Sequence, residues 1–188
     1  MYDILIIGSG PGGYVAAIRA AQLGLRVGCI DKSEVGGTCL NVGCIPSKSL
    51  LDSSLKHYHL LNQFEDHGLH VDGLQLDLDK MMSRKQDLIT QLTNGVGALF
   101  KSNKVDFISG IAKIKNRNEV EIIQDSKTEI LQTQNIIIAT GSNPIELENI
   151  KFDENIVDSE GALKFDRVPK QIVVIGAGVI GLELSSVW

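Results

Sequence analysis

The stretch Asp3-Ile4-Leu5-Ile6-Ile7-Gly8-Ser9-Gly10-Pro11-Gly12-Gly13 decides the fold of this chain. Its first five residues are a short, mostly β-branched apolar run, which predicts a strand buried on both faces. The Ala-rich segment Tyr14–Leu23 then predicts a helix, and Arg26–Ile30 predicts a second strand with Asp31 at its end. A Gly-x-Gly-x-x-Gly motif in this strand–helix–strand context is typical of a dinucleotide-binding unit.

Each glycine of this motif has a separate physical task. Gly8 permits a tight turn, Gly10 lets the backbone approach a pyrophosphate, and Gly13 lets helix and strand pack closely. The amides at the helix N-terminus then hold the phosphates, and Asp31 accepts hydrogen bonds from an adenosine ribose. The alternative interpretation is a glycine-rich turn in an α/β domain that binds no nucleotide.

A second informative stretch, Gly36–Lys48, begins five residues after Asp31 and contains Cys39 and Cys44. Proline suits the first position of a helix, so Pro46 predicts a helix start there that continues into residues 57–64. Cys44 would then lie near a helix N-terminus, which favours a thiolate and a reversible disulfide with Cys39. Two buried structural cysteines are the alternative. Lys48 would sit unfavourably in the first turn, so we interpret it as functional.

The middle of the chain predicts one long helix and several strands. Residues 79–101 predict a helix whose apolar face holds Ile89, Leu92, Val96 and Leu99. Strands are expected at 105–108 and at 112–114, 119–123 and 128–131, the last three as an antiparallel meander with turns at 116–118 and 125–127. A separate buried strand at 135–139 leads into Thr140-Gly141-Ser142, where ligands bind in open α/β sheets.

The C-terminal part carries the glycine motif again. After a polar linker or crossover at 146–170, residues 171–175 predict a strand, and Gly176, Gly178 and Gly181 repeat the Gly-x-Gly-x-x-Gly spacing before a helix begins at 182–188. A dinucleotide unit needs at least one further strand, so we expect only the start of a second one. The predicted domains are 1–148 and 149–188, in the α/β class.

Composition restricts the function classes. The net charge of −5 argues against a nucleic-acid surface, and three cysteines without clustered partners argue against a zinc site. Cys29, alone in an apolar run, is interpreted as a core residue. We expect no targeting segment and no membrane span, because no basic region precedes the first strand and glycines interrupt the apolar run at 172–184. The expected compartment is a reducing cytoplasm.

Two dinucleotide motifs with Cys-x4-Cys between them resemble the flavin disulfide reductases. Two stretches of the sequence resemble specifically the dihydrolipoamide dehydrogenases of that family. They are Gly-Gly-Thr-Cys-Leu-Asn-Val-Gly-Cys-Ile-Pro-Ser-Lys at 36–48 and Gly-Ala-Gly-Val-Ile-Gly-Leu-Glu-Leu-Ser-Ser-Val-Trp at 176–188. Glutathione and trypanothione reductases usually carry Lys at the position of Ser47 and Val at that of Leu40. Mercuric reductases are closer to this chain in the disulfide stretch than glutathione and trypanothione reductases are.

The resemblance implies both a fold and roles for individual residues of this chain. It implies a Rossmann-like FAD-binding domain with an antiparallel meander, followed by the truncated start of a Rossmann-like NAD-binding domain. The residues that would hold FAD are Gly8, Gly10, Gly13, Asp31, Lys32, Gly37, Thr38, Lys48, Ala112, Thr140, Gly141 and Ser142. Those that would hold the NAD pyrophosphate are Gly176, Gly178 and Gly181. Cys39 would be the thiol that meets the substrate, Cys44 the thiol facing the flavin, and Glu183 the ion partner of Lys48.

The resemblance also implies the reaction, which is oxidation of protein-bound dihydrolipoamide through a Cys39–Cys44 disulfide and FAD to NAD. Expected partners are the lipoyl domains of 2-oxo-acid dehydrogenase complexes or of the glycine cleavage system, and the parent enzyme is expected to be a homodimer. The family's general base and flavin-ribitol segment have no counterpart here, so we expect the 188-residue chain alone to be inactive. The alternatives are a mercuric or glutathione-type reductase and a non-catalytic FAD-domain fragment.

Overall fold

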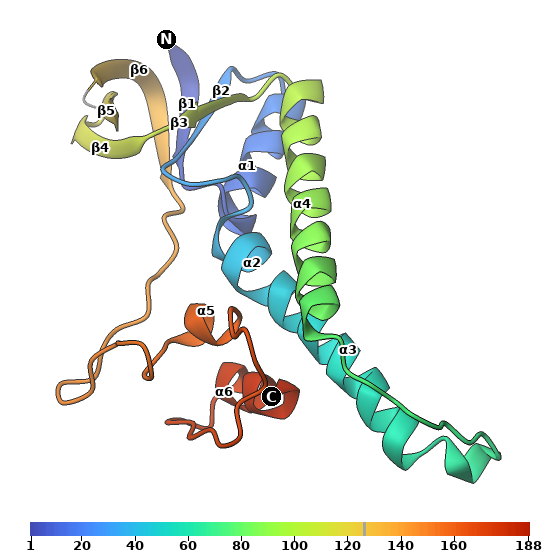
Figure 1. Cartoon of the computed structure of the whole chain (residues 1–188). Helices are drawn as coiled ribbons and strands as arrows, with labels where there is room; N and C mark the ends of the chain where they lie inside the picture. The colour runs from blue at the N-terminus through green and yellow to red at the C-terminus, as the bar shows by residue number, and fades with distance from the viewer. Residues whose placement is uncertain (126) are drawn as a thin grey trace. The chain divides into compact units, whose positions relative to one another are not determined.

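The computed structural model describes residues 1–125 and 127–188, so Ser126 in the predicted turn at 125–127 lies outside the described residues. The chain forms two compact units (Figure 1). The first comprises residues 1–41 and 90–142, and the second comprises residues 42–89 and 143–188. Each unit is therefore assembled from two separate parts of the sequence.

The first unit is built on a six-stranded sheet of order β3-β2-β1-β6-β5-β4. Its strands are β1 (Tyr2–Ile7), β2 (Val27–Asp31), β3 (Asp106–Ser109), β4 (Ile111–Asn116), β5 (Glu119–Gln124) and β6 (Lys127–Ile138). Strand β1 pairs in parallel with β2 and β6, and β2 pairs in parallel with β3. Strands β4, β5 and β6 pair antiparallel. Helix α1 (Pro11–Gln22) joins β1 to β2, so the predicted strand–helix–strand unit is confirmed.

Strand β6 differs from prediction because it is one strand of 12 residues, not two separate ones. Its first half pairs antiparallel with β5, and from Thr133 it pairs in parallel with β1. The buried Thr133 Oγ1 donates to the backbone oxygen of Asn135, and the Thr133 amide donates to that of Asn118. These bonds satisfy the polar groups where the strand changes partner, so a polar segment continues the sheet instead of ending it.

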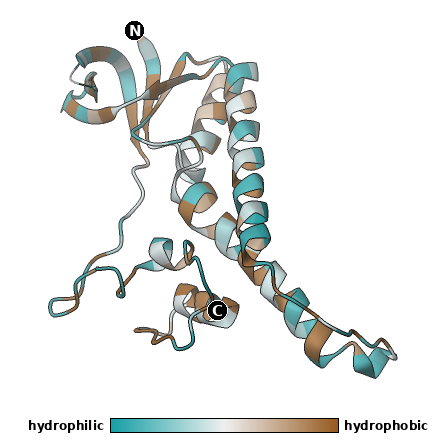
Figure 2. Cartoon of the chain, viewed as in Figure 1, coloured by the Kyte–Doolittle hydropathy of each residue, from teal (hydrophilic) through white to brown (hydrophobic). Residues whose placement is uncertain are grey.

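Apolar side chains of both sheet halves meet in one cluster of the first unit. Leu5, Ile7 and Ile30 of the parallel strands pack with Val120 and Ile122 of the meander, and Figure 2 shows hydrophobic colour along these strands. Burying a side chain of this size contributes about 1.5–3 kcal/mol. This cluster packs the parallel strands against the meander.

Helix α4 (Leu78–Ser102) confirms the predicted long helix and half of its predicted buried face. Ile89 and Val96 are buried as predicted, whereas Leu92 and Leu99 are 41% and 48% exposed. Phe100 is also buried, and its ring lies 6.2 Å from that of Phe107 on β3. Residues four apart lie on one helix face, so this contact turns Val96 and Phe100 inward together.

The second unit is helical. It contains α3 (Cys44–Asn62), the 3-10 turn η1 (Glu65–His67), the first part of α4, and the helices α5 (Ser159–Ala162) and α6 (Val179–Val187). Leu50, Leu163 and Leu184 form its buried centre, with Met81, Met82, Ala162, Val187 and Trp188 packed around them. An isolated β-bridge joins Leu147 and Ile150 in the predicted linker. The short α2 (Gly37–Val42), which the sequence did not predict, precedes α3.

The predicted strand at 171–175 is wrong, because these residues are not a strand in the structure. Val173 and Ile175 are 80% and 66% exposed, and Figure 2 shows hydrophobic colour on the extended stretch leading into α6. A strand exists only when a neighbour accepts and donates its backbone hydrogen bonds, and none of the described strands pairs with these residues.

Candidate functional site

The first glycine motif forms a turn that only glycine fits. Gly8 has φ +105°, and a Cβ added there would lie 2.1 Å from the backbone oxygen of Ala139. A Cβ added at Gly13 would lie 1.8 Å from the oxygen of Gly8. Residues other than glycine rarely adopt such a positive φ. The turn is therefore closed on one side by α1 and on the other by the end of β6.

Backbone also approaches backbone on the remaining side of this turn. Gly10 is the N-cap of α1 and supplies no side-chain cap, and Pro11 follows at the first helical positions. A Cβ added at Gly37 would lie 2.5 Å from the Gly10 Cα, and the Gly36 amide donates to the Ser9 oxygen at 3.0 Å. Uncapped amides at a helix N-terminus form an anion site, so the residues present fit a dinucleotide pyrophosphate.

Asp31 ends β2 beside this turn, as predicted from the motif. Its Oδ2 accepts from the Ser9 amide at 2.7 Å and from the Ser9 hydroxyl at 2.8 Å, and its Oδ1 accepts from the Ser33 amide at 3.0 Å. Lys32, the next residue, is exposed. The sequence did not single out Ser9, although a hydroxyl inside a glycine turn is a polar group that needs a partner.

Cys29 lies under the same turn and is fully buried, which confirms the predicted core cysteine. Its Sγ lies 3.6 Å from the Gly8 oxygen, to which it donates. Burial, and then the negative charge of Asp31, raise the pKa of the Cys29 thiol to about 12. The thiolate is the reactive form of cysteine, so Cys29 is inert at neutral pH.

The end of β6 places the turn Thr140-Gly141-Ser142 at the same edge of the sheet. The Ala139 amide donates to the Ile7 oxygen at 2.7 Å, and the three exposed residues follow directly, with Gly141 at φ +70°. Ala112 lies on β4 opposite Ile122 and packs against the core cluster. The structure thus brings Gly8 and Thr140 together, whereas Ala112 lies in the meander.

The first glycine turn, residues 8–13, and the second, Gly36-Gly37, together form what we call the cradle. Helix α2 starts directly at this cradle. Gly37 is its first residue, Thr38 is exposed, and Cys39 is half-buried one residue later. The Asn41 side chain donates to the oxygens of Val35 at 3.2 Å and of Gly37 at 2.9 Å. Asn41, which sequence reasoning missed, therefore holds the glycine turn that precedes the cysteine.

Helix α3 begins two residues earlier than predicted, with the exposed Cys44 as its first residue and Gly43 as its N-cap. Pro46 is its third residue, not its first. The first amides of a helix have no intrahelical partner, so proline removes no hydrogen bond there. The first intrahelical bond runs from the Ser47 amide to the Gly43 oxygen at 3.0 Å. The Cys44 thiol thus stands at the positive end of a helix dipole.

Lys48 and Glu183 form an ion pair within the second unit. The Lys48 Nζ lies 2.7 Å from Oε1 and 2.6 Å from Oε2 of Glu183. The side chains are 58% and 24% exposed. Exposed pairs contribute about 0–1 kcal/mol to stability, so stability alone gives little reason to hold a lysine in the first turns of α3.

Two further cations of α4 tie the second unit together, and the sequence indicated neither. Arg84 donates to the Ser49 hydroxyl at 3.1 Å and to Asp52 Oδ2 at 3.0 Å, while Lys56 also binds Asp52. The buried Lys85 Nζ donates to the Leu163 oxygen at 2.6 Å. Burial, and then the charge of Lys164, lower the pKa of Lys85. Such long-range partners have no signal in local sequence.

The second glycine motif repeats the turn but not its surroundings. Gly176 has φ +108°, and a Cβ at Gly181 would lie 2.7 Å from the Gly176 oxygen. Gly178 is the N-cap of α6. Among the described residues, nothing lies within 4 Å of a Cβ added at Gly176 or Gly178. The predicted NAD-binding glycines therefore form the local turn without a neighbouring sheet.

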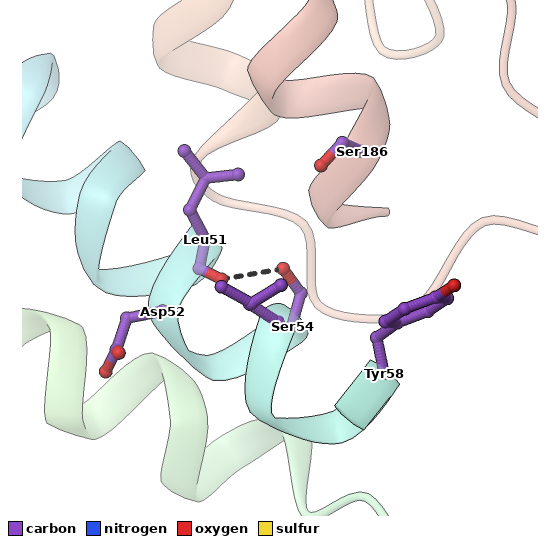
Figure 3. A pocket seen from close by; sticks show the side chains of 6 residues that line it. Leu51, Asp52, Ser54, Tyr58 and Ser186 are labelled. Atoms are coloured by element: carbon purple, nitrogen blue, oxygen red, sulfur yellow. Dashed lines mark hydrogen bonds between the residues drawn. The ribbon is translucent and has the colours of Figure 1, made fainter. Parts of the chain in front are cut away.

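A groove in the second unit has none of the predicted site residues in its lining. Figure 3 shows it between α3 and α6, with Leu51, Asp52, Ser54, Leu55, Tyr58 and Ser186 as its lining. The Ser54 hydroxyl donates to the Leu51 backbone oxygen at 3.1 Å. Asp52, the acidic residue of the lining, is paired with Lys56 and Arg84. These groups are already satisfied, so the groove offers no reactive centre.

Neither a metal cluster nor a membrane helix occurs in the part of the chain that the structure describes. Within residues 1–125 and 127–188, no three or more His, Cys, Asp or Glu side chains are placed to hold a metal ion. No helix of those residues is long and apolar enough to cross a bilayer.

Comparison with known proteins gives a family and close relatives. The family model described as pyridine nucleotide-disulphide oxidoreductase matches residues 2–188. The mitochondrial dihydrolipoyl dehydrogenases of Rattus norvegicus and Homo sapiens are each 51% identical to the chain over 191 residues. The match covers 99% of this chain and 37% of each relative, so the chain spans little more than a third of their length.

Solved structures agree on the fold. The HOCl-induced flavoprotein disulfide reductase RclA of Escherichia coli, in two copper(II) complexes, superposes with TM-scores of 0.82 and 0.80 at 26% and 27% identity. Each match covers 99% of this chain and 39% of that protein. The predicted α/β fold with a Rossmann-like FAD-binding domain is confirmed.

Proposed function

Because the chain belongs to the pyridine nucleotide-disulphide oxidoreductase family, we propose that it is the part of a flavin-dependent dihydrolipoamide dehydrogenase that holds FAD and the redox cysteines. The observation that carries this proposal is the contact between the two glycine turns of the first unit. Gly37 touches Gly10, so helix α2 with Cys39 starts directly at the dinucleotide cradle. The 51% identity to the dihydrolipoyl dehydrogenases supports the choice among the reductases.

The proposed cofactor residues are those that the family resemblance implies. For FAD they are the turn glycines with Asp31, Lys32, Thr38, Lys48, Ala112 and the turn 140–142, and for NAD they are Gly176, Gly178 and Gly181. FAD held by these residues would supply the transfer of two electrons from a dithiol to NAD. We propose that residues 1–148 are the FAD-binding domain and that residues 149–188 are the start of the NAD-binding domain.

The protein's own chemistry is thiol exchange. A dihydrolipoyl thiolate attacks Cys39 Sγ of a Cys39–Cys44 disulfide, the S–S bond breaks, and Cys44 leaves as a thiolate stabilised by the α3 N-terminus. The second lipoyl thiol, once deprotonated, attacks the mixed disulfide and releases Cys39. The lipoyl group loses two electrons and two protons; the cysteine pair gains the electrons, and the protons pass to solvent water. The Glu183 carboxylate holds the Lys48 ammonium near this helix start.

The proposed partners are lipoyl domains of 2-oxo-acid dehydrogenase complexes or of the glycine cleavage system, with a homodimeric whole enzyme. A cysteine pair that cycles between states suits a reducing compartment. The predicted cytoplasmic location stays a prediction, because the names of the relatives place those proteins in mitochondria. We expect these 188 residues alone not to turn over, since none of the described strands pairs with the residues before the second glycine motif.

Thiol labelling tests the proposal. The air-oxidised folded chain is treated with iodoacetamide at pH 8 and its intact mass is measured before and after mild reduction. We expect no label before reduction and two labels after it, on Cys39 and Cys44. Cys29 is the internal control, because a thiol with a pKa of about 12 stays protonated at pH 8 and reacts only after unfolding.

The variants Cys39→Ser and Cys44→Ser should each leave one thiol that labels without reduction. Labelling of both cysteines in the air-oxidised wild-type chain would contradict the disulfide. Retention of FAD after dialysis, followed by its absorbance, separates the flavin proposal from the thiol proposal.

A further inference from the structure

Ser9 has no solvent exposure, and all of its polar atoms are engaged. Its amide and its hydroxyl both donate to Asp31 Oδ2, at 2.7 and 2.8 Å. Its backbone oxygen accepts from the Gly36 amide at 3.0 Å. One residue thus joins the glycine turn, the acid at the end of β2 and the second glycine turn.

These bonds restrict the Asp31 carboxylate. An ionised carboxylate has about four acceptor sites on its two oxygens. Ser9 fills two of them on Oδ2, and the Ser33 amide, at 3.0 Å, fills one on Oδ1. The remaining acceptor site belongs to Oδ1, and three fixed donors hold the plane of the group. An acceptor fixed before binding loses less freedom when a ligand hydroxyl donates to it.

We propose that Ser9 is a positioning residue that orients Asp31 to accept from a ribose hydroxyl, and so selects nucleotides with an intact ribose. This inference rests on the proposed nucleotide site in the first unit. The Ser9 hydroxyl acts through the carboxylate, since it is fully buried against Asp31 and has no free donor left for a ligand.

Binding of ADP and of 2′,3′-dideoxy-ADP tests the proposal, measured by calorimetry on the 188-residue chain. The Ser9→Ala variant keeps the amide bond but loses the hydroxyl bond. Hydrogen bonds to charged groups contribute enough for about a tenfold change in affinity. We expect Ser9→Ala to weaken ADP about tenfold and dideoxy-ADP less than twofold. Ser33→Ala is the matched control, because Ser33 binds Asp31 through its amide alone, and it should change neither ligand.

A double variant separates positioning from general damage to the turn. In an Asp31→Asn background, Ser9→Ala should change ADP affinity less than twofold, because the charged acceptor is already lost. If Ser9→Ala does not fold, Ser9→Cys, a weaker donor of similar size, should give an intermediate ADP preference. Equal weakening of both ligands would overturn the role of Ser9 and leave the nucleotide site standing. A wild-type chain that binds neither ADP nor FAD would overturn both.

Discussion

The glycine turn at residues 8–13 and the one at residues 176–181 share a backbone but not an environment. Gly8 and Gly176 have φ of +105° and +108°, and in each motif the last glycine packs on the oxygen of the first. A Cβ at Gly8 would meet Ala139, whereas a Cβ at Gly176 would have no neighbour within 4 Å among the described residues. Spacing in the sequence therefore determines the turn, while the sheet around it determines whether a cradle exists.

The two motifs are also held in place differently. The first follows β1, which is bonded on both sides by β2 and β6. The second follows residues 171–175, which are not a strand, and its position depends on α6, whose Leu184 is buried with Leu50 and Leu163. Backbone hydrogen bonds hold one turn, and side-chain packing holds the other.

Alanine at the first glycine of each motif should give the largest contrast. Gly8→Ala forces a Cβ into the Ala139 carbonyl at an unfavourable φ, and we expect it to lower the free energy of unfolding by about 3 kcal/mol or more. Gly176→Ala meets only the unfavourable φ, so about 1–2 kcal/mol is expected. Urea unfolding followed by far-UV circular dichroism measures both. Equal losses would mean that the sheet adds nothing at Gly8.

Leu184→Ala should loosen the second motif and spare the first. Leu184 is 6% exposed, and truncating a buried leucine costs about 2–5 kcal/mol. The protein's one tryptophan, Trp188, reports on this unit, because its indole donates to the Ala162 oxygen and its ring lies 5.3 Å from Phe165. We expect tryptophan fluorescence to change at lower urea while ADP binding stays. Leu182→Ala, 58% exposed on the same helix, is the matched control.

Asp31→Ala tests whether Asp31, which belongs to the first glycine motif and has no counterpart after the second, accepts a hydrogen bond from the ribose. A hydrogen bond to a carboxylate contributes about 1.5–3 kcal/mol, so FAD affinity should fall about tenfold or more. Flavin content after dialysis measures this loss. Asp106→Ala is the control, since Asp106 lies at the N-terminal end of β3, whereas Asp31 lies at the C-terminal end of the neighbouring β2, and Asp106 accepts from the Tyr2 hydroxyl. Unchanged flavin content in Asp31→Ala would contradict the assignment.

Glu183→Gln should have the smallest effect on stability. Its partner Lys48 is 58% exposed, so less than about 1 kcal/mol is expected, and less still at high salt. Thermal unfolding at low and high salt checks this. A loss above that range would mean that the ion pair, and not Leu184, holds the second motif in place.

Local patterns predicted the parts of the fold whose cause is local. The run 3–7, the glycines after it and the Ala-rich helix gave β1, α1 and β2 because strand periodicity, turn conformation and helix propensity act within a few residues. The sequence predicts two strands, 128–131 and 135–139, where the structure has the single strand β6, because the polar residues Gln132-Thr133-Gln134 separate the two apolar runs. The second half of β6 pairs with β1, more than a hundred residues away in the sequence, and no local pattern contains that partner.

The site divides in the same way. Asp31 and the turn glycines carry their chemistry in their spacing, whereas the contact between Lys48 and Glu183 was implied only by the family resemblance. Ser9, Asn41 and Lys85 were missed because their roles depend on which oxygen lies within 3 Å in the folded chain. The variable positions of a glycine motif have no pattern that would reveal such a bond.

The contact between Gly8 and Ala139 also determines when the cradle can be completed during synthesis. Gly8 is synthesised 131 residues before Ala139, the residue that packs against its turn, counted from 8 to 139. At about 5–20 residues per second, that interval is roughly 7–26 s. Throughout it, β1 lacks one neighbour and its apolar edge is open. Contacts this distant in sequence slow folding, so the nascent chain needs protection longest at β1, which precedes the other strands of this sheet.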